Sequence, residues 1–411
     1  MIGFATYVRF VRDNAPFLLV GALLTMLSSF GQTFFIAVFG GEIRAEFGLS
    51  NGEWGLIYMF STAASAVAMV FMGGLVDKFR VRTLGILVVG LLASSCFAMA
   101  INPYAAMLPF VIFALRFFGQ GMVSHVALVA MARWFIATRG RALAIASLGI
   151  MLAEAAMPIT LVWLKGFFAW QTLWFGTGII ALLLMPVLYR LLRLERTPQS
   201  SLAEDHVVGM DCKHWTRKDV LRHPLFWSLM PALLFFPAFG TSFWFHQVHF
   251  AEIKGWDHLS IVAMLPLGTV ALVTSSFAYG AAIDKFGAGR LFPIYLLPLC
   301  IAFTLHWYAP TPAWSAIAVV LMGIAGGGQA TLPIAIWAEF FGTRNIGSIK
   351  SMVAAVMVLG TAIGPGLSGV LIDLGFGFEQ QMLVFAASFL LAALISIAPL
   401  KRAIRQLPTA T

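Results

Sequence analysis

The sequence predicts an all-α integral membrane protein whose twelve transmembrane helices form two pseudo-symmetric six-helix bundles. Composition is the first observation, because 60% of the 411 residues are apolar and only 10% are charged. In soluble domains about a quarter of the residues are charged. The second observation is that the apolar residues gather in long runs. A helix needs about 20 such residues to cross roughly 30 Å of hydrocarbon, and in lipid it satisfies its own backbone polar groups.

Twelve apolar runs of this kind follow one another along the chain. A polar stretch between the sixth and seventh runs divides them into two sets of six. We therefore predict an N-terminal bundle over residues 1–193, a cytoplasmic linker loop over 194–224 and a C-terminal bundle over 225–411. The runs cover residues 16–40, 54–76, 83–101, 104–132, 141–164, 170–190, 225–249, 258–282, 290–309, 312–338, 347–372 and 380–399.

The distribution of basic residues predicts the orientation of these helices. The chain carries 26 Lys and Arg against 17 Asp and Glu. Of the basic residues, 22 fall on one set of alternate loops and termini, and only Arg44, Lys165 and Lys254 fall on the other. Cytoplasmic loops carry the excess of Lys and Arg in membrane proteins, so both termini are expected in the cytoplasm. We expect a bacterial-type inner (plasma) membrane as the location and no nucleic acid as a partner.

Cofactor and disulfide patterns are not evident. The three cysteines, Cys96, Cys212 and Cys300, do not suggest a disulfide framework. The Gly-x-Gly step of the fourth span has no preceding strand, which a dinucleotide site requires. We therefore predict no cofactor.

A charged loop occurs twice at a fixed distance. The first copy, residues 73–82, contains Asp-Lys-Phe, and the second copy, residues 280–290, repeats these three residues 207 positions later. Pro158 in the fifth span and Pro365 in the eleventh are also 207 positions apart. Such repeats indicate two halves related by an axis along the membrane normal.

The repeated loop resembles the loop between helices 2 and 3 of the major facilitator superfamily, with its echo between helices 8 and 9. Arg80 stands where that family often has glycine. The run from Arg116 to Gly121 (Arg-Phe-Phe-Gly-Gln-Gly) is similar to the family's fourth-helix motif. The resemblance covers essentially the whole chain and implies a monomeric solute transporter whose halves rock about a midplane site. It also implies that helices 1, 4, 7 and 10 line the solute path. On these helices the candidate substrate-binding residues are Gln32, Arg116, His246 and Gln329.

In that superfamily the repeated loop acts as a gate at the inner face. The resemblance therefore implies a gating role for its charged residues, with Asp77 paired to Arg133 or Arg141 as the expected latch. The alternative is a solvated turn that serves only as a topology determinant. The expected gating residues are Asp77, Arg80, Arg82, Arg133, Arg141, Asp284 and Arg290.

Two ionisable residues, Arg116 and Glu154, lie deep in the spans. A charge at the bilayer centre costs at least ~2.5–3.5 kcal/mol, so each needs a partner or a watery cavity. At 1.5 Å per residue, Arg116 is expected roughly 18 Å and Glu154 roughly 15 Å below the outer face. A structural ion pair between them is one interpretation. The other is that Arg116 attracts an anionic substrate while Glu154 binds and releases the coupling proton.

His246 and His249 are three residues apart and therefore lie on one helical face. The neighbouring sequence lacks the Cys and Asp residues that would complete a metal site, so no metal is expected. We expect His246 to contact substrate or to take part in proton coupling, because histidine changes its charge near physiological pH.

These features predict a secondary active transporter, because the sequence has no ATP-binding motif. A single deep arginine favours a small organic anion, such as a monocarboxylate, carried by symport with protons. The alternative is a proton-coupled exporter of lipophilic drugs, although the fifth span lacks the Gly-Pro run of the drug antiporters. A receptor or a membrane enzyme is a further alternative. The sequence offers neither an output domain nor a nucleophile–base spacing, so we expect no enzymatic activity. The expected partners are the solute, protons and the lipid bilayer.

Overall fold

A computed structural model of the protein describes residues 4–135, 138–193 and 208–407; within these ranges it does not describe the side chains of residues 4–8, Asp77, Arg139 and Ser351. Every regular element in the described part is helical. Among these residues, eleven helical stretches are long and apolar enough to cross a membrane, and Ala15–Gly31 is a shorter apolar helix. The predicted all-α membrane fold is confirmed, with one difference in its first span.

The chain divides into two compact units. Unit 1 comprises Met1–Leu49 and Phe60–Leu202, and unit 2 comprises Ser50–Met59 and Ala203–Thr411. Of the predicted linker loop, residues 194–207 lie outside the described part and residues 208–224 lie within it.

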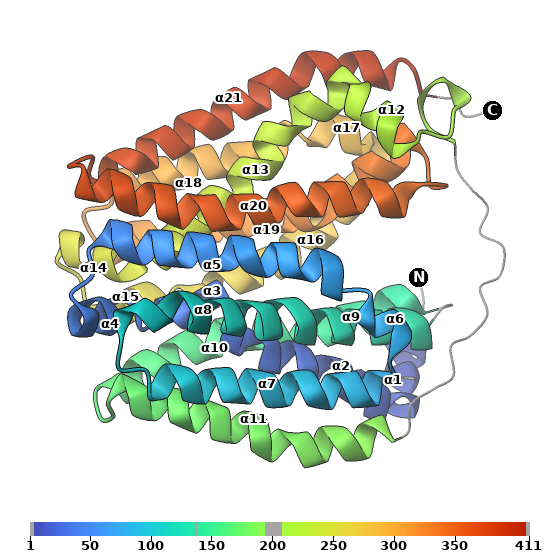
Figure 1. Cartoon of the computed structure of the whole chain (residues 1–411). Coiled ribbons are helices and arrows are strands. Elements are labelled where there is room, and N and C mark those ends of the chain that lie inside the picture. Colours follow the sequence, from blue (N-terminus) through green and yellow to red (C-terminus); the bar gives the residue numbers. More distant parts are fainter. Residues whose placement is uncertain (1–3, 136–137, 194–207, 408–411) are drawn as a thin grey trace. The chain divides into compact units, whose positions relative to one another are not determined.

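The elements that lie wholly or mainly in unit 1 are α1 (Phe4–Asp13), α2 (Ala15–Ser28), η1 (Ser29–Gly31), α3 (Thr33–Ala37), α4 (Gly40–Phe47), α5 (Asn51–Met72), α6 (Leu75–Lys78), α7 (Val81–Ala100), η2 (Ala105–Met107), α8 (Leu108–Leu115), the π-helix η3 (Arg116–Val123), α9 (Ser124–Trp134), α10 (Arg139–Lys165) and α11 (Trp170–Leu192). Helices α7 and α11 run side by side in this unit (Figure 1). Helix α5 begins in residues that group with unit 2.

The elements of unit 2 are η4 (Met210–Cys212), α12 (Arg217–Arg222), α13 (Pro224–Phe245), α14 (Gln247–Lys254), α15 (His258–Val262), α16 (Leu265–Phe286), α17 (Ala288–Leu291), η5 (Ile294–Leu296), α18 (Leu297–Tyr308), α19 (Pro312–Phe341), α20 (Ile346–Asp373) and α21 (Phe378–Ile404). Helix α18 packs between α19 and α21.

The first span is not one long helix, because it is broken twice. After α2 and the short turn η1, Gln32 has extended backbone angles (φ −83°, ψ 156°), and the chain then resumes as α3. A second interruption separates α3 from α4. In lipid such a break is tolerated only where other protein groups or water satisfy the exposed backbone groups. The break in the first span therefore marks a polar position inside unit 1.

Small residues bring the helices of each unit into close contact. In unit 1 an added Cβ at Gly149 of α10 would lie 2.0 Å from the carbonyl oxygen of Ala22 on α2. In unit 2 a Cβ at Gly323 of α19 would lie 2.3 Å from the carbonyl oxygen of Gly268 on α16. Membrane helices associate through such small-residue contacts, because there is no hydrophobic effect between helices in lipid. The contacts fix the rotation of α10 and α19 and hence the direction of their polar side chains.

Candidate functional site

Arg116 lies at the break of the first span. Its side chain is 1% exposed, and its Nη1 donates to the carbonyl oxygen of Gly31 at 3.1 Å and to the Thr33 hydroxyl at 3.3 Å. The broken segment thus supplies two neutral acceptors, one from the backbone and one from a side chain. The guanidinium carries its positive charge into the interior of unit 1, next to a discontinuous helix.

Two glycines allow this approach. A Cβ at Gly31 would lie 2.0 Å from the carbonyl oxygen of Leu115 and 2.9 Å from the Cα of Gly119, and a Cβ at Gly119 would lie 2.7 Å from the Cα of Gly31. The backbones of the first and fourth spans therefore touch at this point. The Gly-x-Gly step of the fourth span is visible in the sequence, but its contact with Gly31 emerges only in the structure.

The turn that starts at Arg116 is wider than an α-helical turn. Residues Arg116–Val123 form a π-helix between α8 and α9. Such turns are rare, and they occur frequently at functional sites. One additional residue rotates the side chains that follow by about 100° relative to those before it. The π-helix therefore decides which face Gln120 and His125 occupy relative to Arg116.

Glu154 does not form the ion pair with Arg116 that the shared depth allows. Within the described part of the chain, no ion pair links these two side chains. Glu154 is partly buried on α10. Gln32 is partly buried at the break itself, and the hydroxyl of Ser29 beside it is buried without a hydrogen-bond partner among the described residues. Ser29 is a polar group that sequence analysis did not select.

In unit 2, Gln329 is held by a tyrosine that sequence analysis missed. The hydroxyl of Tyr295 donates to Oε1 of Gln329 at 2.8 Å, and Nε2 of Gln329 lies 3.8 Å from Sδ of Met357 on α20. Tyr295 is completely buried and Gln329 is 9% exposed. A buried tyrosine hydroxyl usually has a hydrogen-bond partner, which is the signal that would have drawn attention to Tyr295 in its apolar span.

His246 lies at the kink between α13 and α14. It is 3% exposed, and its Nε2 is 3.0 Å from the carbonyl oxygen of Pro365, which can only accept, so Nε2 carries the hydrogen. His249 instead lies 3.8 Å from the carboxylate of Glu252. The next residue, Gln247, was not predicted; it is fully buried, and neither amide atom has a hydrogen-bond partner in the described part of the chain.

A comparison with protein families determines which family this chain belongs to. The family model described as Major Facilitator Superfamily matches residues 21–278 and 267–409. The chain belongs to the major facilitator superfamily. It is a multi-pass membrane protein and a secondary transporter, not an enzyme.

Curated relatives within this superfamily are distant. The chain is 26% identical over 279 residues to Monocarboxylate transporter 13 of Bos taurus, a match that covers 67% of this chain and 63% of the bovine protein. It is 22% identical over 390 residues to the Cis,cis-muconate transport protein of Acinetobacter baylyi, which covers 91% of both chains. A Multidrug resistance protein B homolog of Mycobacterium tuberculosis is 33% identical over 115 residues, 28% of this chain and 21% of that protein.

Solved structures of two other transporters have a similar fold. A bacterial homologue of the human lysosomal transporter Spinster, in an inward-facing conformation, gives a TM-score of 0.72 at 16% identity and covers 97% of this chain and 99% of that chain. The nucleoside transporter NupG gives 0.69 at 13% identity, with coverage of 94% and 99%. At these identities the likeness shows the fold alone.

In unit 1, Arg133 contacts the backbone of the repeated loop, next to its expected partner Asp77. Nη1 of Arg133 donates to the carbonyl oxygen of Val76 at 2.9 Å. The side chain of Asp77, the expected partner, lies outside the described part. Arg141 packs over the ring of Phe10, with 5.8 Å from its guanidinium carbon to the ring centroid. A backbone carbonyl is therefore one anchor of this loop.

The remaining predicted gating residues lie towards the surface. The guanidinium of Arg82 packs over the ring of Tyr189 at 5.8 Å, whereas Arg80, Asp284 and Arg290 are exposed. None of these four takes part in an ion pair among the described residues.

The second copy of the loop is anchored by an acid that the prediction did not include. Glu339, near the end of α19, accepts a hydrogen bond from the N–H of Ala288 at 3.0 Å, at the start of α17. Arg133 and Glu339 lie 206 positions apart, close to the offset of the repeat. The first copy of the loop is thus contacted by a basic side chain, Arg133, which donates to a carbonyl oxygen. The second copy is contacted by an acidic side chain, Glu339, which accepts from an N–H. Neither backbone partner is visible in a sequence pattern.

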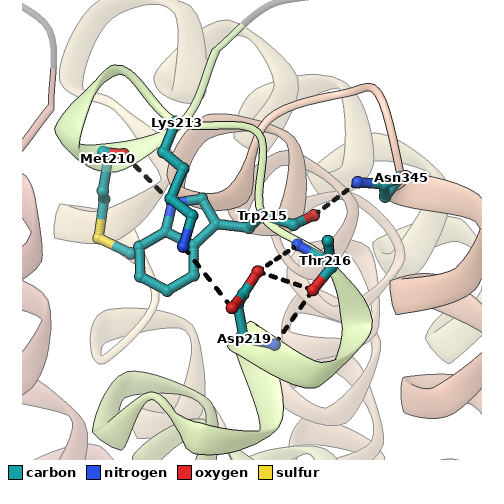
Figure 2. Close-up of polar contacts among 6 residues, drawn as sticks. All are labelled: Met210, Lys213, Trp215, Thr216, Asp219 and Asn345. Carbon is teal, nitrogen blue, oxygen red and sulfur yellow. Dashed lines mark hydrogen bonds and ion pairs between the residues drawn. The ribbon is translucent and has the colours of Figure 1, made fainter.

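Residues 208–223, which we call the linker clasp, fold onto unit 2. Figure 2 shows Trp215 at its centre, where its indole Nε1 donates to the carbonyl oxygen of Met210 at 3.2 Å. The amide of Asn345, from the segment between α19 and α20, donates to the carbonyl oxygen of Trp215 at 3.0 Å. The N–H of Asp211 donates a hydrogen bond to the carbonyl oxygen of Gln406 at 3.0 Å. This part of the predicted linker loop is therefore structured.

A capping box starts helix α12 within the linker clasp (Figure 2). The hydroxyl of Thr216 accepts from the N–H of Asp219 at 3.3 Å, and the carboxylate of Asp219 accepts from the N–H of Thr216 at 3.1 Å. Lys213 lies 3.6 Å from the same carboxylate. Hydrogen bonds from the side chain and backbone of Thr216, together with the nearby Lys213 charge, lower the pKa of Asp219. The cap is therefore intact at neutral pH.

Proposed function

We propose that the protein carries a small organic anion, of the monocarboxylate class, together with protons. The observation that carries the proposal is a positive charge at a break in a membrane helix, because buried Arg116 donates to the carbonyl of Gly31 and the hydroxyl of Thr33. A guanidinium stays charged in proteins and binds carboxylates through paired N–H groups. Discontinuous helices near the midplane form the solute sites of many secondary transporters.

Two relatives support an anionic solute. Their names refer to monocarboxylates and to cis,cis-muconate, and the muconate protein matches over 91% of this chain. Both solutes carry the carboxylate group that an arginine recognises. We propose that Gln32 in unit 1, and His246 and Gln329 in unit 2, contribute neutral hydrogen bonds to the solute.

Proton coupling is proposed to involve Glu154, with His246 as a second candidate. An ionisable residue inside a membrane segment is a functional candidate by default, because its burial is costly. Glu154 lies on α10, which packs directly against α2 of the broken first span. A carboxylate there can bind and release a proton during the cycle without direct contact with Arg116.

We further propose that both termini lie in the cytoplasm of a bacterial-type inner membrane, from the excess of Lys and Arg on one set of loops. The superfamily resemblance supports a monomer. The loops anchored by Arg133 and Glu339 are the proposed inner gate, together with the exposed charges of the two repeats.

The alternative function is proton-coupled export of lipophilic compounds. It is favoured by the 33% identity over 115 residues to a Multidrug resistance protein B homolog. That match covers 28% of this chain, whereas the muconate match is nearly complete, so the organic anion is preferred.

Uptake by purified protein in proteoliposomes tests the proposal. Radiolabelled lactate and cis,cis-muconate are compared with a lipophilic cation under an inward proton gradient. The variant Arg116→Ala removes an interaction with a charged group worth about 1.5–3 kcal/mol, so carboxylate uptake should fall roughly ten- to hundredfold in kcat/KM. Arg116→Lys keeps the charge and should retain part of the activity. Arg12→Ala, at a side chain that is 81% exposed, is the control.

Two further outcomes complete this test. Glu154→Gln should remove the dependence of carboxylate uptake on the proton gradient. Transport of the lipophilic cation alone, unaffected by Arg116→Ala, would refute the organic-anion proposal and support the exporter.

A further inference from the structure

The amide of Gln329 has a fixed orientation in unit 2. Its oxygen accepts the hydroxyl hydrogen of Tyr295 at 2.8 Å, and its nitrogen faces α20, 3.8 Å from the sulfur of Met357. A primary amide presents one acceptor and two N–H donors. Tyr295 occupies the acceptor side, and Met357 takes a weak hydrogen bond from the nitrogen. The second N–H of the amide is then the group left for a solute, and it is a donor.

The position of Gln329 is fixed by close packing around it. A Cβ at Gly327 would lie 2.1 Å from the Ser275 hydroxyl oxygen, and a Cβ at Gly328 would lie 2.8 Å from the Cβ of Tyr295. These contacts hold α19 against α16 and against the segment that carries Tyr295. The helix therefore cannot rotate Gln329 away. With its first two side-chain torsions unchanged, the amide can still make a half-turn about its last bond.

We propose that Tyr295 is a positioning residue for substrate recognition: by engaging the oxygen of Gln329, it makes the substrate side of this residue a hydrogen-bond donor. The inference rests on the proposed function and deepens it, because it names the chemistry that unit 2 selects. A carboxylate only accepts hydrogen bonds and matches a donor surface. The corresponding primary amide carries its own N–H donors and matches it less well.

Without the tyrosine hydroxyl, the two amide orientations of Gln329 become nearly equal in energy. Half of the molecules then present an oxygen to the carboxylate, so its apparent affinity falls about twofold. A primary amide can pair with either orientation and gains up to one neutral hydrogen bond, so the preference for carboxylate over amide should fall roughly two- to tenfold.

The first experiment measures this preference in proteoliposomes. Lactate uptake is measured with increasing lactamide as competitor in wild type, Tyr295→Phe and Gln329→Glu. Tyr295→Phe should raise the KM for lactate with little change in kcat and lower the lactate-to-lactamide preference. Gln329→Glu retains the acceptor for Tyr295 and replaces the donor by an oxygen, so it should lose lactate uptake. Tyr308→Phe is the matched control, because that tyrosine is 60% exposed.

The second experiment tests the hydrogen bond without any substrate. Unfolding equilibria of Tyr295→Phe, Gln329→Met and the double variant in mixed micelles form a double-mutant cycle. The expected coupling is roughly two- to tenfold in the unfolding equilibrium constant. A coupling factor of one in the unfolding equilibrium constant means that the two side chains do not interact, and it would overturn the positioning role of Tyr295. An unchanged lactate-to-lactamide preference in Tyr295→Phe would overturn it as well. Failure of wild type to transport any carboxylate would instead overturn the proposed function.

Discussion

The contact between Gly31 and the fourth span offers the sharpest test of the site's architecture. In Gly31→Ala the added Cβ would lie 2.0 Å from the carbonyl oxygen of Leu115, whereas ordinary contacts are 3.4–4 Å. The two backbones would therefore have to separate by about 1.4 Å, and overpacking of a tight core typically costs 1–3 kcal/mol. Because the obstructing atoms are backbone and cannot rotate away, we expect about 3 kcal/mol or more of lost unfolding free energy. The same separation would move Arg116 from its carbonyl partner.

Equilibrium unfolding in mixed micelles, followed by far-UV circular dichroism, measures this loss. The control is Gly176→Ala in α11, where an added Cβ meets nothing within 4 Å; it should stabilise the helix by about 1 kcal/mol. Gly119→Ala adds a Cβ to the same contact from the fourth span. One separation of the backbones relieves both clashes, so the double variant should lose less unfolding free energy than the sum of the two single variants. If Gly31→Ala unfolds within about 0.5 kcal/mol of wild type, the two spans do not touch at this point.

Three further predictions concern parts outside that contact. Gln247→Met should raise the unfolding free energy, because a buried amide without partners costs about 1–3 kcal/mol per group; a less stable variant would show that the amide is satisfied. Arg133→Met should accelerate amide hydrogen exchange in residues 73–80, whereas Arg80→Met should not, and equal exchange in both variants would exclude Arg133 as the anchor. The lowered pKa of Asp219 means that its ionised form stabilises the folded state. Wild type should therefore unfold at a higher temperature than Asp219→Asn at pH 6, and the difference should shrink as the pH falls below the ordinary aspartate range of about 4; a constant difference would contradict the cap.

Prediction from the sequence worked where the signal is local. Runs of about 20 apolar residues identify membrane helices because crossing the hydrocarbon sets their length. The recurrence of Asp-Lys-Phe after 207 positions carried the resemblance to the superfamily, which the family comparison confirms. The site was less predictable: Arg116 and Gln329 were found because polar side chains stand out in apolar spans, but Tyr295 and Glu339 were not selected.

The sequence by itself determined that this is a helical transporter of the superfamily with one deep arginine. Only the tertiary structure decided that Arg116 meets the broken first span without an ion pair to Glu154, and that Tyr295 orients Gln329. The physical reason is that a hydrogen-bond partner from another helix depends on helix rotation. One additional residue in a π-turn changes that rotation by about 100°, while the apolar pattern that the sequence displays stays the same.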